Sequence, residues 1–292
     1  MTILVSAANG KTGRNVISAL LARGDATPIR ALIRKPGAII PGVTPVYADL
    51  MEPKSLAPAL EGVDTVIHYG PSLHAYETFM GMNMIDAAKV AGVSRFIFIS
   101  VIHPEIDNLL NHKAKLAIES YLINSRLDWT VLRPQHYVQN IPVTRIVEQG
   151  RLVMPYPVET VLGHVDMRDL AEAAAKVAIE SGHVYATYDV DAGEHLSVTE
   201  IVETISRLSG KPAQAVEIDP YDFVKNIGPH WGEPLTDYAI EAFHRLFGYY
   251  ARHGIYGNAN VLTWLLGRKP LSFADYVKHS LEGQSGPVSN VY

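Results

Sequence analysis

The first half of the chain alternates between two patterns of apolar positions. Short continuous apolar runs, typical of buried strands, are followed by stretches in which apolar residues recur at helical spacing. The runs predict strands at residues 3–7, 29–33, 43–48, 65–69, 95–100 and 129–133, and the spaced stretches predict helices at 15–23, 56–60, 80–90 and 115–123. This alternation predicts an α/β fold, a doubly wound parallel sheet with helices on both faces. Ligands of such sheets bind beyond the carboxyl ends of the strands, where the strand order reverses.

The second half of the chain is less regular. It predicts a helix at residues 167–179, a strand at 185–190 and a helix at 198–208, and after Pro220 the pattern becomes mostly helical and aromatic. Twelve of the 25 aromatic residues lie between Tyr221 and Tyr276. We therefore expect an NAD(P)-binding Rossmann domain at residues 1–155 and a smaller, mostly helical substrate lobe at 156–292, with a segment at about 163–190 packing back on the first domain.

A glycine motif lies between the first predicted strand and the first predicted helix. Ala7, Gly10 and Gly13 have the spacing of G-x-x-G-x-x-G, with alanine in the first glycine position. Such a loop brings the backbone at Gly10 close to a pyrophosphate, lets the helix pack on the sheet at Gly13, and presents the helix N-terminus to the phosphates. The flanking strand and helix disfavour the alternative, an ordinary turn. The residues expected to bind the cofactor here are Ala7, Asn9, Gly10, Lys11, Thr12 and Gly13.

The residues after the second predicted strand indicate which dinucleotide is bound. NAD-binding folds place an acidic residue there for the ribose 2′-hydroxyl, whereas this chain has Arg34 and Lys35. Two cations suit a 2′-phosphate, and Lys11 can add a third charge, so the sequence favours NADP(H). The alternative is that both are solvated residues at the start of a loop. Asp49 and Leu50 end the third strand and are expected near the adenine.

Composition and charge narrow the class of protein. The 292 residues are 48% apolar and 19% charged, which is typical of a globular chain with a large core. A net charge of −5 without a Lys/Arg cluster argues against a nucleic-acid partner. The absence of cysteine excludes disulfides and thiolate chemistry, and the 12 histidines lack the spacing of a metal site. The chain has neither the pattern of a signal peptide nor that of a membrane span, so we expect a cytoplasmic protein without a membrane partner.

Several further segments, together with the glycine loop, resemble the NmrA-like branch of the atypical short-chain dehydrogenases/reductases. The segments are residues 87–93 running into 98–100, the K-x-x-x-E pair of Lys115 and Glu119, residues 128–134 with Asn140, residues 164–171, and residues 267–270 before Phe273. The resemblance covers nearly the whole chain. It implies an NADP(H) or NAD(P) cofactor, with either reductase activity on quinones, dyes or phenylpropanoid-type double bonds, or a redox-sensing role without turnover.

The resemblance raises a question about the proton donor. Short-chain reductases usually place a tyrosine four residues before a lysine that holds the ribose and lowers the pKa of the tyrosine. Lys115 fits the lysine position, but the position four residues earlier holds Asn111, whose amide cannot supply a proton at neutral pH. The usual proton relay is therefore not expected. Pro134, which ends the last core strand, is a further expected cofactor contact, and the alternative for Lys115 is a surface lysine on a helix.

Four other side chains are candidates for the chemistry. The imidazole of His112 can protonate an alkoxide or enolate near neutral pH. Tyr137 follows the last core strand, where a substrate is expected, and His136 lies beside it. Ser100 ends the fifth strand and can orient a substrate oxygen. The competing interpretations are that His112 caps a helix, that Tyr137 packs against the cofactor, and that His136 is structural.

The aromatic residues of the second half predict an apolar substrate pocket, the core of the lobe, or both. We expect Trp231, Tyr249 and Tyr250 to line the pocket. The sequence thus predicts an NADPH-dependent reductase of a small apolar or aromatic electrophile, a quinone or a conjugated C=C or C=O. Two alternatives stay open. One is a non-catalytic NADP(H)-binding sensor with a protein partner, and the other is a redox-neutral isomerase or cyclase that uses His112 and Lys115 as acid and base. A homo-oligomer is compatible with each.

Overall fold

The computed structural model describes residues 1–35, 40–227 and 235–283. The chain divides into two compact units. The first consists of Met1–Asp107, Asn111–Pro134 and Arg168–Asp189, and the second of Asn108–Leu110, Gln135–Met167 and the described residues from Val190 onward. Residues 168–189, which lie within the segment expected from the sequence to pack on the nucleotide-binding domain, belong to the first unit.

A seven-stranded sheet forms the centre of the first unit, in the order β10-β6-β5-β4-β1-β2-β3. The strands are β1 (Ile3–Val5), β2 (Ile29–Ile33), β3 (Thr44–Tyr47), β4 (Thr65–His68), β5 (Arg95–Ile99), β6 (Asp128–Pro134) and β10 (Ala186–Val190). Neighbouring strands from β3 to β6 pair in parallel. The chain order reverses at β1, which lies between β2 and β4, so the carboxyl ends of β1 and β4 flank the crevice where such sheets bind ligands.

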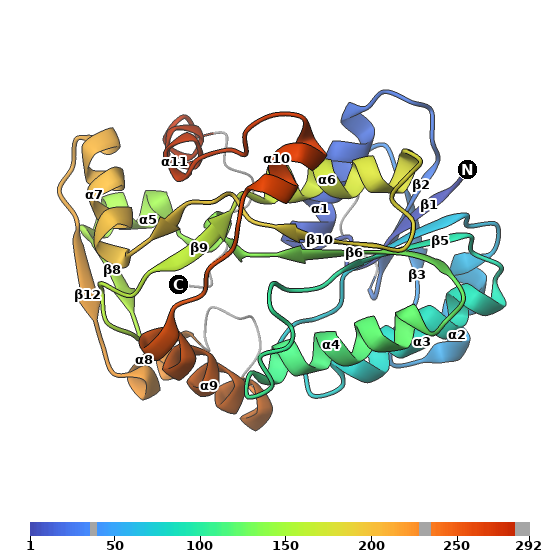
Figure 1. Ribbon diagram of the computed structural model, residues 1–292, viewed down its shortest axis with the longest axis horizontal. Coiled ribbons are helices and arrows are strands. Elements are labelled where there is room, and N and C mark those ends of the chain that lie inside the picture. Colours follow the sequence, from blue (N-terminus) through green and yellow to red (C-terminus); the bar gives the residue numbers. More distant parts are fainter. Residues whose placement is uncertain (36–39, 228–234, 284–292) are drawn as a thin grey trace. The chain divides into compact units, whose positions relative to one another are not determined.

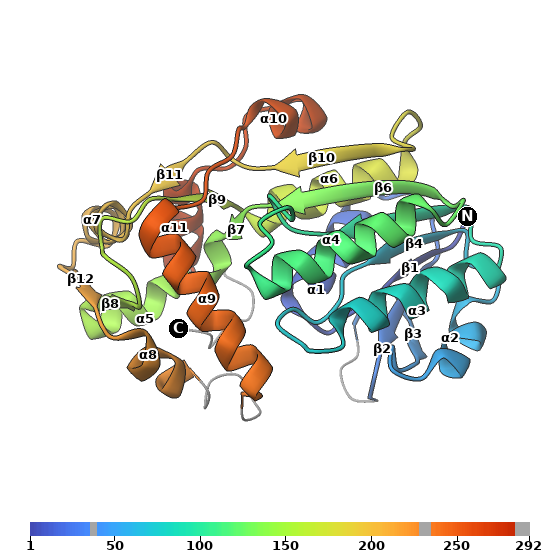
Figure 2. The ribbon, with the colours of Figure 1, turned by 60° about the horizontal axis from the view of Figure 1, so that its bottom comes forward.

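Helices cover both faces of this sheet, which confirms the predicted doubly wound fold. Helices α1 (Lys11–Ala22) and α6 (Met167–Ile179) lie on one face, and α2 (Pro53–Leu60), α3 (Glu77–Val90) and α4 (Leu110–Ile123) lie on the other (Figures 1 and 2). Helix α1 buries Val16, Ile17 and Leu20, which the helical period places on one side. Buried residues of α2, α3 and α4 pack with strand residues such as Phe96 and Phe98 in one hydrophobic cluster.

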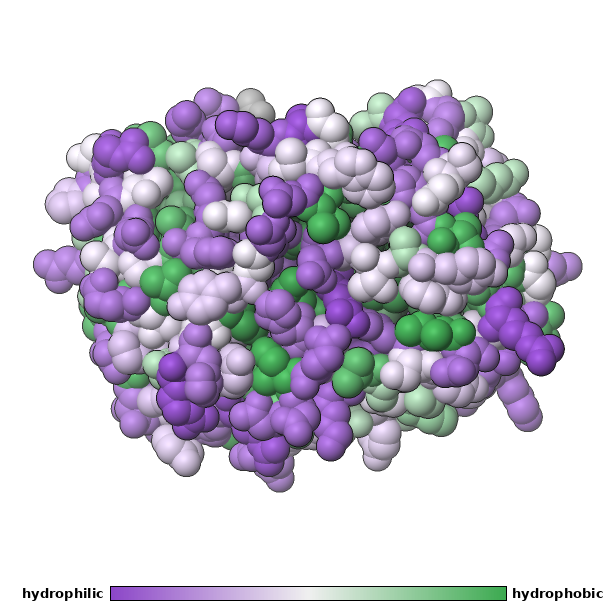
Figure 3. Space-filling view, viewed as in Figure 1, coloured by the Kyte–Doolittle hydropathy of each residue, from purple (hydrophilic) through white to green (hydrophobic). Residues whose placement is uncertain are grey.

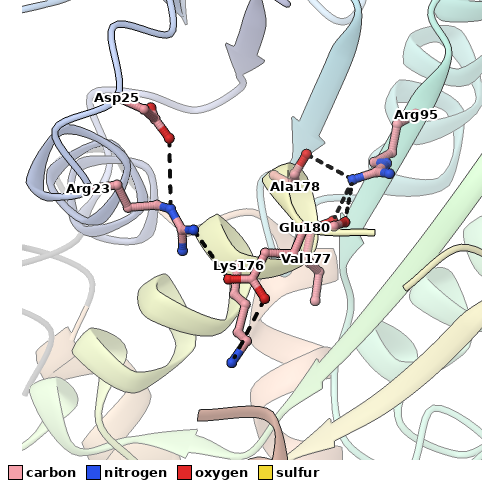
Figure 4. A network of polar contacts seen from close by, with 7 residues as sticks. All are labelled: Arg23, Asp25, Arg95, Lys176, Val177, Ala178 and Glu180. Atoms are coloured by element: carbon pink, nitrogen blue, oxygen red, sulfur yellow. Dashed lines mark hydrogen bonds and ion pairs between the residues drawn. The ribbon is translucent and has the colours of Figure 1, made fainter. Parts of the chain in front are cut away.

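An ion pair and a charged cap attach the end of α6 to the rest of the first unit (Figure 4). The guanidinium of Arg95 donates hydrogen bonds to the carbonyl oxygens of Val177, Ala178 and Glu180 at 3.2, 3.0 and 2.9 Å. These carbonyls are at the end of a helix, where a cation also complements the helix dipole. The Glu180 carboxylate pairs with Arg23, which caps α1, at 3.2 Å. These contacts therefore join β5, the end of α6 and the end of α1, which are far apart in sequence.

The second unit contains two small sheets and several helices. One sheet has the order β11-β9-β7 and the other pairs β12 with β8. The strands are β7 (His136–Tyr137), β8 (Arg151–Met154), β9 (Leu162–Val165), β11 (His195–Leu196) and β12 (Gln214–Glu217). The helices are η1 (Val138–Asn140), α5 (Val143–Gln149), α7 (Val198–Ser209), α8 (Pro220–Ile227), α9 (Asp237–His253), α10 (Asn260–Leu266) and α11 (Phe273–Leu281). Side-chain capping boxes begin α7 and α11.

Hydrophilic and apolar residues are mixed over the face of the molecule drawn in Figure 3. Single exposed apolar side chains of this kind are ordinary on protein surfaces. Within residues 1–35, 40–227 and 235–283, no helix has both the length and the apolar character that crossing a membrane requires.

Candidate functional site

The glycine loop joins β1 to α1 with a backbone that leaves little free space. Ala7 has φ +48°, a left-handed conformation that glycine adopts more readily, in the position where the motif usually has glycine. A Cβ on Gly13 would lie 2.4 Å from the Ala7 carbonyl oxygen and 2.8 Å from the Ala8 Cα. A Cβ on Gly10 would meet only the Ala7 oxygen, at 3.2 Å. Gly13 is thus required by the packing of α1 on the loop, whereas the protein alone nearly tolerates a side chain at Gly10.

The start of α1 suits the phosphates of a dinucleotide. Gly10 is the N-cap residue and has no side chain to bond the first helical N–H groups. The first turn of α1 contains no acidic residue, so its amides and the positive end of the helix dipole face no built-in anion. The space beside Gly10, which a Cβ there would partly fill, lies next to the uncapped N–H groups at the start of α1. This arrangement fits the pyrophosphate group.

Three cationic side chains, those of Lys11, Arg34 and Lys35, follow the carboxyl ends of β1 and β2. Burial lowers the pKa of Lys11, in the glycine loop, to about 8. Arg34 and Lys35 follow β2 and are exposed, and neither forms an ion pair with any residue whose placement is described. Asp49 folds back on its own loop, where its carboxylate accepts a hydrogen bond from the Met51 N–H at 2.9 Å. The three cations therefore remain available to phosphate groups.

Two alanine substitutions separate the role of the loop in folding from its role in binding. We expect Gly13→Ala to lower the free energy of unfolding by about 1–3 kcal/mol, since the new Cβ overlaps the backbone of Ala7 and Ala8. We expect Gly10→Ala to change stability by less than about 1 kcal/mol and to weaken NADPH binding by about tenfold or more. Urea denaturation and calorimetric titration measure the two effects. Equal losses of stability in both variants would contradict this division.

Lys115 forms a buried ion pair with a residue that the sequence did not single out. Its Nζ donates to Glu77 Oε1 at 2.6 Å, and only 4% and 1% of the two side chains are exposed. Burial alone would lower the pKa of Lys115, but the charge of Glu77, with smaller contributions from Tyr69 and Glu119, raises it. Burial raises the pKa of Glu77, and Lys115 opposes this effect. An ammonium has three N–H donors, so one can bind Glu77 while others bind ribose hydroxyls.

A small polar cluster lies where β1 and β4 end. The Ser6 Oγ accepts a hydrogen bond from the Tyr69 N–H at 2.9 Å, donates to the Tyr69 carbonyl at 2.9 Å, and lies 3.0 Å from His68 Nδ1. Burial, together with the charge of Lys115, lowers the pKa of His68 to about 3, so this imidazole is neutral at physiological pH. The nearby Lys115 Nζ lies 5.3 Å from the centre of the Tyr69 ring. Pairing of β1 with β4 thus brings Ser6 and Tyr69 together, and Lys115 of α4 contacts the Tyr69 ring.

Glu119 of the K-x-x-x-E pair binds two other residues of the site. Its carboxylate accepts two hydrogen bonds from Arg133, at 3.1 and 2.6 Å, and one from the Ser100 hydroxyl at 2.5 Å. Arg133 also pairs with Glu105 at 2.9 Å. Ser100 is buried and its proton is directed to Glu119. Its proposed role in orienting a substrate oxygen stays a prediction, and the contacts point to a role in fixing Glu119.

Asn111 and His112 start α4 close to Lys115 in sequence. His112 is buried and its Nδ1–H donates to the His103 carbonyl at 2.9 Å. Burial lowers its pKa to about 4, which leaves little imidazolium at neutral pH. The Oδ1 of Asn111 is buried and has no hydrogen-bond partner among the residues described. Both residues stay candidates, and for His112 these contacts favour the structural interpretation.

The expected substrate residues belong to the second unit, apart from Trp231, which lies outside the described residues. The His136 ring contacts Tyr250 edge-on at 6.1 Å, and Tyr249 packs against His253 at 4.7 Å. Burial lowers the pKa of His136 to about 4. Tyr137 pairs with Val165 in β7 and β9. His136 also lines a small cavity whose other walls include Met154 and Tyr156. The structure therefore brings His136 and Tyr250 together within one apolar, aromatic region.

Sequence reasoning missed Glu77 and Tyr69. Glu77 is a polar residue in a helix that was recognised by its apolar spacing, so the pattern gave no signal for it. Tyr69 gave a weak signal, because it ends the fourth strand next to the strand of the glycine loop. Both are separated from Lys115 by about 40 residues, and only the folded sheet and helices place them beside it.

Comparison with known sequences identifies a family. The sequence model of the NmrA-like family matches residues 1–278. The chain is 25% identical over 288 residues to quinone oxidoreductase 2 of Escherichia coli strain K12, with 95% of this chain and 98% of that protein aligned. It is 28% identical over 283 residues to the NAD(P)H azoreductase of Xenophilus azovorans, with 94% and 96% aligned.

Solved structures share the fold. The Escherichia coli NADPH-dependent quinone oxidoreductase QOR2 complexed with NADPH has a TM-score of 0.79 at 23% identity, covering 96% of this chain and 99% of that one. The triphenylmethane reductase of a Citrobacter species complexed with NADP(H) also has a TM-score of 0.79, at 24% identity, covering 96% and 100%. The predicted Rossmann-type fold class is thereby confirmed, and the likeness to these two structures covers 96% of the chain.

Proposed function

This chain belongs to the NmrA-like family, and from that premise we propose that it is an NADPH-dependent reductase of a small apolar or aromatic electrophile. The observation that carries the proposal is the nucleotide end of the first unit. This end contains the glycine loop, the start of α1, which has no side-chain cap, and three cations, Lys11, Arg34 and Lys35. The coarser assignment, an NAD(P)H-dependent oxidoreductase, agrees with the quinone oxidoreductase and azoreductase among its relatives.

Each group has a part in binding the cofactor. The first N–H groups of α1 and Lys11 hold the pyrophosphate, and Arg34 and Lys35 hold the 2′-phosphate. Asp49 and Leu50 lie on the loop expected at the adenine. Lys115, fixed by Glu77, donates to the nicotinamide ribose. When bound, NADPH supplies a hydride from its nicotinamide ring.

The substrate class follows from what the site lacks. Asn111 stands where a catalytic tyrosine is usual, and His112 is neutral and buried. An electrophile whose reduced form is a stable anion needs little help from an acid, and a quinone is of this kind. A conjugated C=C or C=O needs a proton at the oxygen that gains charge. The aromatic region around His136, Tyr156 and Tyr250 suits an apolar ligand.

Calorimetric titration with NADPH and with NADH tests the cofactor assignment. We expect NADH to bind at least about tenfold more weakly, which corresponds to about 1.4 kcal/mol, because it lacks the 2′-phosphate. In Arg34→Ala, the preference for NADPH should fall while NADH binding stays the same. Exposed Arg245, which pairs with Glu241, provides a matched control in Arg245→Ala. If neither nucleotide binds, the reductase proposal is wrong.

The charge of Lys11 makes cofactor binding sensitive to pH. Below its pKa of about 8 the ammonium attracts the phosphates, and above that pH the charge is lost. We therefore expect NADPH affinity to fall by about threefold to tenfold between pH 7 and pH 9.5. In Lys11→Arg the side chain stays charged, so the affinity should change little over this range. An equal pH dependence in both proteins would assign the effect to another group.

The absence of the usual tyrosine also favours a second candidate, a non-catalytic NADP(H) sensor. Such a protein binds both NADPH and NADP⁺ but oxidises NADPH with none of the electrophiles tested. A turnover assay with quinones and enones therefore distinguishes a sensor from a reductase. The redox-neutral alternative, with His112 and Lys115 as acid and base, has less support because His112 is neutral, buried and bonded to His103.

A further inference from the structure

We propose that the phenol of Tyr69, the residue directly after β4, supplies the proton to the substrate oxygen, in place of the residue that α4 lacks at Asn111. This inference rests on the proposed reductase function and adds a catalytic residue to it. Three observations carry it: the place of Tyr69 in the sheet, the way its backbone is fixed, and its contact with Lys115.

Tyr69 directly follows β4, whose neighbour β1 leads into the glycine loop. The strand order reverses between these two strands, so the residue stands at the crevice where doubly wound sheets bind their ligands. Unlike Ser100 and His112, which are fully buried, Tyr69 is partly exposed. A phenol at this place can reach a substrate beside the cofactor.

The backbone of Tyr69 is fixed by the last residue of β1. The Ser6 hydroxyl accepts from the Tyr69 N–H and donates to the Tyr69 carbonyl, both at 2.9 Å. Ser6 is itself fully buried, and His68 Nδ1 lies 3.0 Å from its oxygen. Positioning by a buried hydroxyl limits the freedom of the tyrosine, which is what a proton donor requires.

Lys115 lies against the tyrosine ring. Its Nζ is 5.3 Å from the ring centre and is held there by Glu77. The usual tyrosine–lysine pair of short-chain reductases comes from one helix, whereas this pair joins β4 to α4. The ammonium charge stabilises the negative charge that the phenol acquires when it gives up its proton. At its other end, the Tyr69 hydroxyl lies 3.3 Å from the Ser72 hydroxyl, which is partly exposed.

The step balances as a two-electron reduction. A hydride from the reduced nicotinamide forms a C–H bond at the electrophilic carbon, and the electron pair of the C=O or conjugated system moves to oxygen. The Tyr69 O–H bond breaks as its proton forms a new O–H bond there. Water then returns a proton to the phenolate, through the Ser72 hydroxyl, while the oxidised nucleotide and the reduced substrate leave.

The test compares the full-length wild type with Tyr69→Phe, which keeps the ring and its contact with Lys115. We expect the rate of enone reduction to fall about 100-fold, because a general acid contributes that much or more, and quinone reduction to fall less than about threefold. NADPH affinity should change less than about twofold. In a complex with NADP⁺, which cannot react, the enone should bind about threefold to tenfold more weakly because a hydrogen-bond donor is lost.

Tyr76→Phe is the matched control, since it removes a phenol hydroxyl from a 57% exposed tyrosine in the same loop. It should leave all of these values unchanged. If Tyr69→Phe reduces the enone at the wild-type rate, with the wild-type pH profile and enone affinity, Tyr69 is not the proton donor although the protein is a reductase. If the wild type itself binds no NADPH or reduces no electrophile, the proposed function fails, and the proton-donor role fails with it.

Discussion

Replacing Glu77 by glutamine is expected to lower the free energy of unfolding by about 3 kcal/mol or more. The substitution leaves the Lys115 ammonium buried without its counter-ion, and breaking one partner of a buried pair typically has an effect of this size. The Nζ–Oε1 distance of 2.6 Å and the nearly complete burial of both side chains place the pair in this class. Urea denaturation followed by circular dichroism measures the loss.

Removal of both charges should restore most of the stability. In the double variant Glu77→Leu with Lys115→Met, two apolar side chains of similar size replace the pair. We expect its free energy of unfolding to lie within about 1 kcal/mol of the wild-type value. The exposed pair of Arg245 and Glu241, at 2.7 Å, gives the control, because Glu241→Gln should change stability by less than about 1 kcal/mol. A Glu77→Gln protein as stable as the wild type would mean that Lys115 loses its proton easily and is not a fixed cation.

The double variant also separates folding from binding. If it folds as well as the wild type but binds NADPH more weakly, the ammonium of Lys115 contributes to holding the cofactor. If its affinity is unchanged, Lys115 has only a structural role, and it has that role as a buried residue, not as the surface lysine that the sequence left open as the alternative. The double variant therefore tests whether Lys115 holds the cofactor, a prediction that the fold alone does not decide.

The central sheet could be predicted because its inner strands β1, β2, β4 and β5 are almost entirely buried. Continuous apolar runs such as residues 95–100 leave few alternatives, and the observed β5 differs from that prediction by one residue. The short strands β7, β8, β9, β11 and β12 gave no comparable signal. They contain two to four residues each and pair across long stretches of sequence, so local periodicity does not reveal them.

The candidate site was predictable where a local motif carries it. The glycine loop needs its residues close together in sequence, since one turn must hold the phosphates. The surroundings of Lys115 come instead from tertiary packing. Helix α3 begins at Glu77, three residues before the apolar pattern that predicted it, because the first turn contributes a buried carboxylate in place of an apolar side chain. The same residue thus explains both the shorter predicted helix and the missed ion pair.

Stability is expected to fall steeply as the pH drops from 6.5 towards 4, because burial keeps four histidines neutral in the folded protein. Burial lowers the pKa of His68 and His164 to about 3 and that of His112 and His136 to about 4, below their ordinary value of 6.5. Since the unfolded chain binds these protons first, the stability from neutral histidines is complete above pH 6.5. It is lost as the pH falls towards the folded-state pKa values.

The expected slope is large. Each histidine contributes up to about 1.4 kcal/mol per pH unit between its two pKa values, so the four together contribute about 5 kcal/mol per pH unit near pH 5. Urea denaturation at pH 7.5, 6 and 5 measures this slope. His68 and His112 report on the first unit, and His136 and His164 report on the second. Domain-specific probes should therefore show a comparable pH dependence for the two units.

A single variant tests the cause. His112→Asn removes one titrating group and keeps an N–H donor for the His103 carbonyl, so the slope should decrease by about 1.4 kcal/mol per pH unit. His253→Asn, at an exposed position, should leave the slope unchanged. A wild-type stability that is constant between pH 7.5 and pH 5 would show that these imidazoles accept protons without unfolding. In that case His112 would again be a candidate for the acid that the reaction needs.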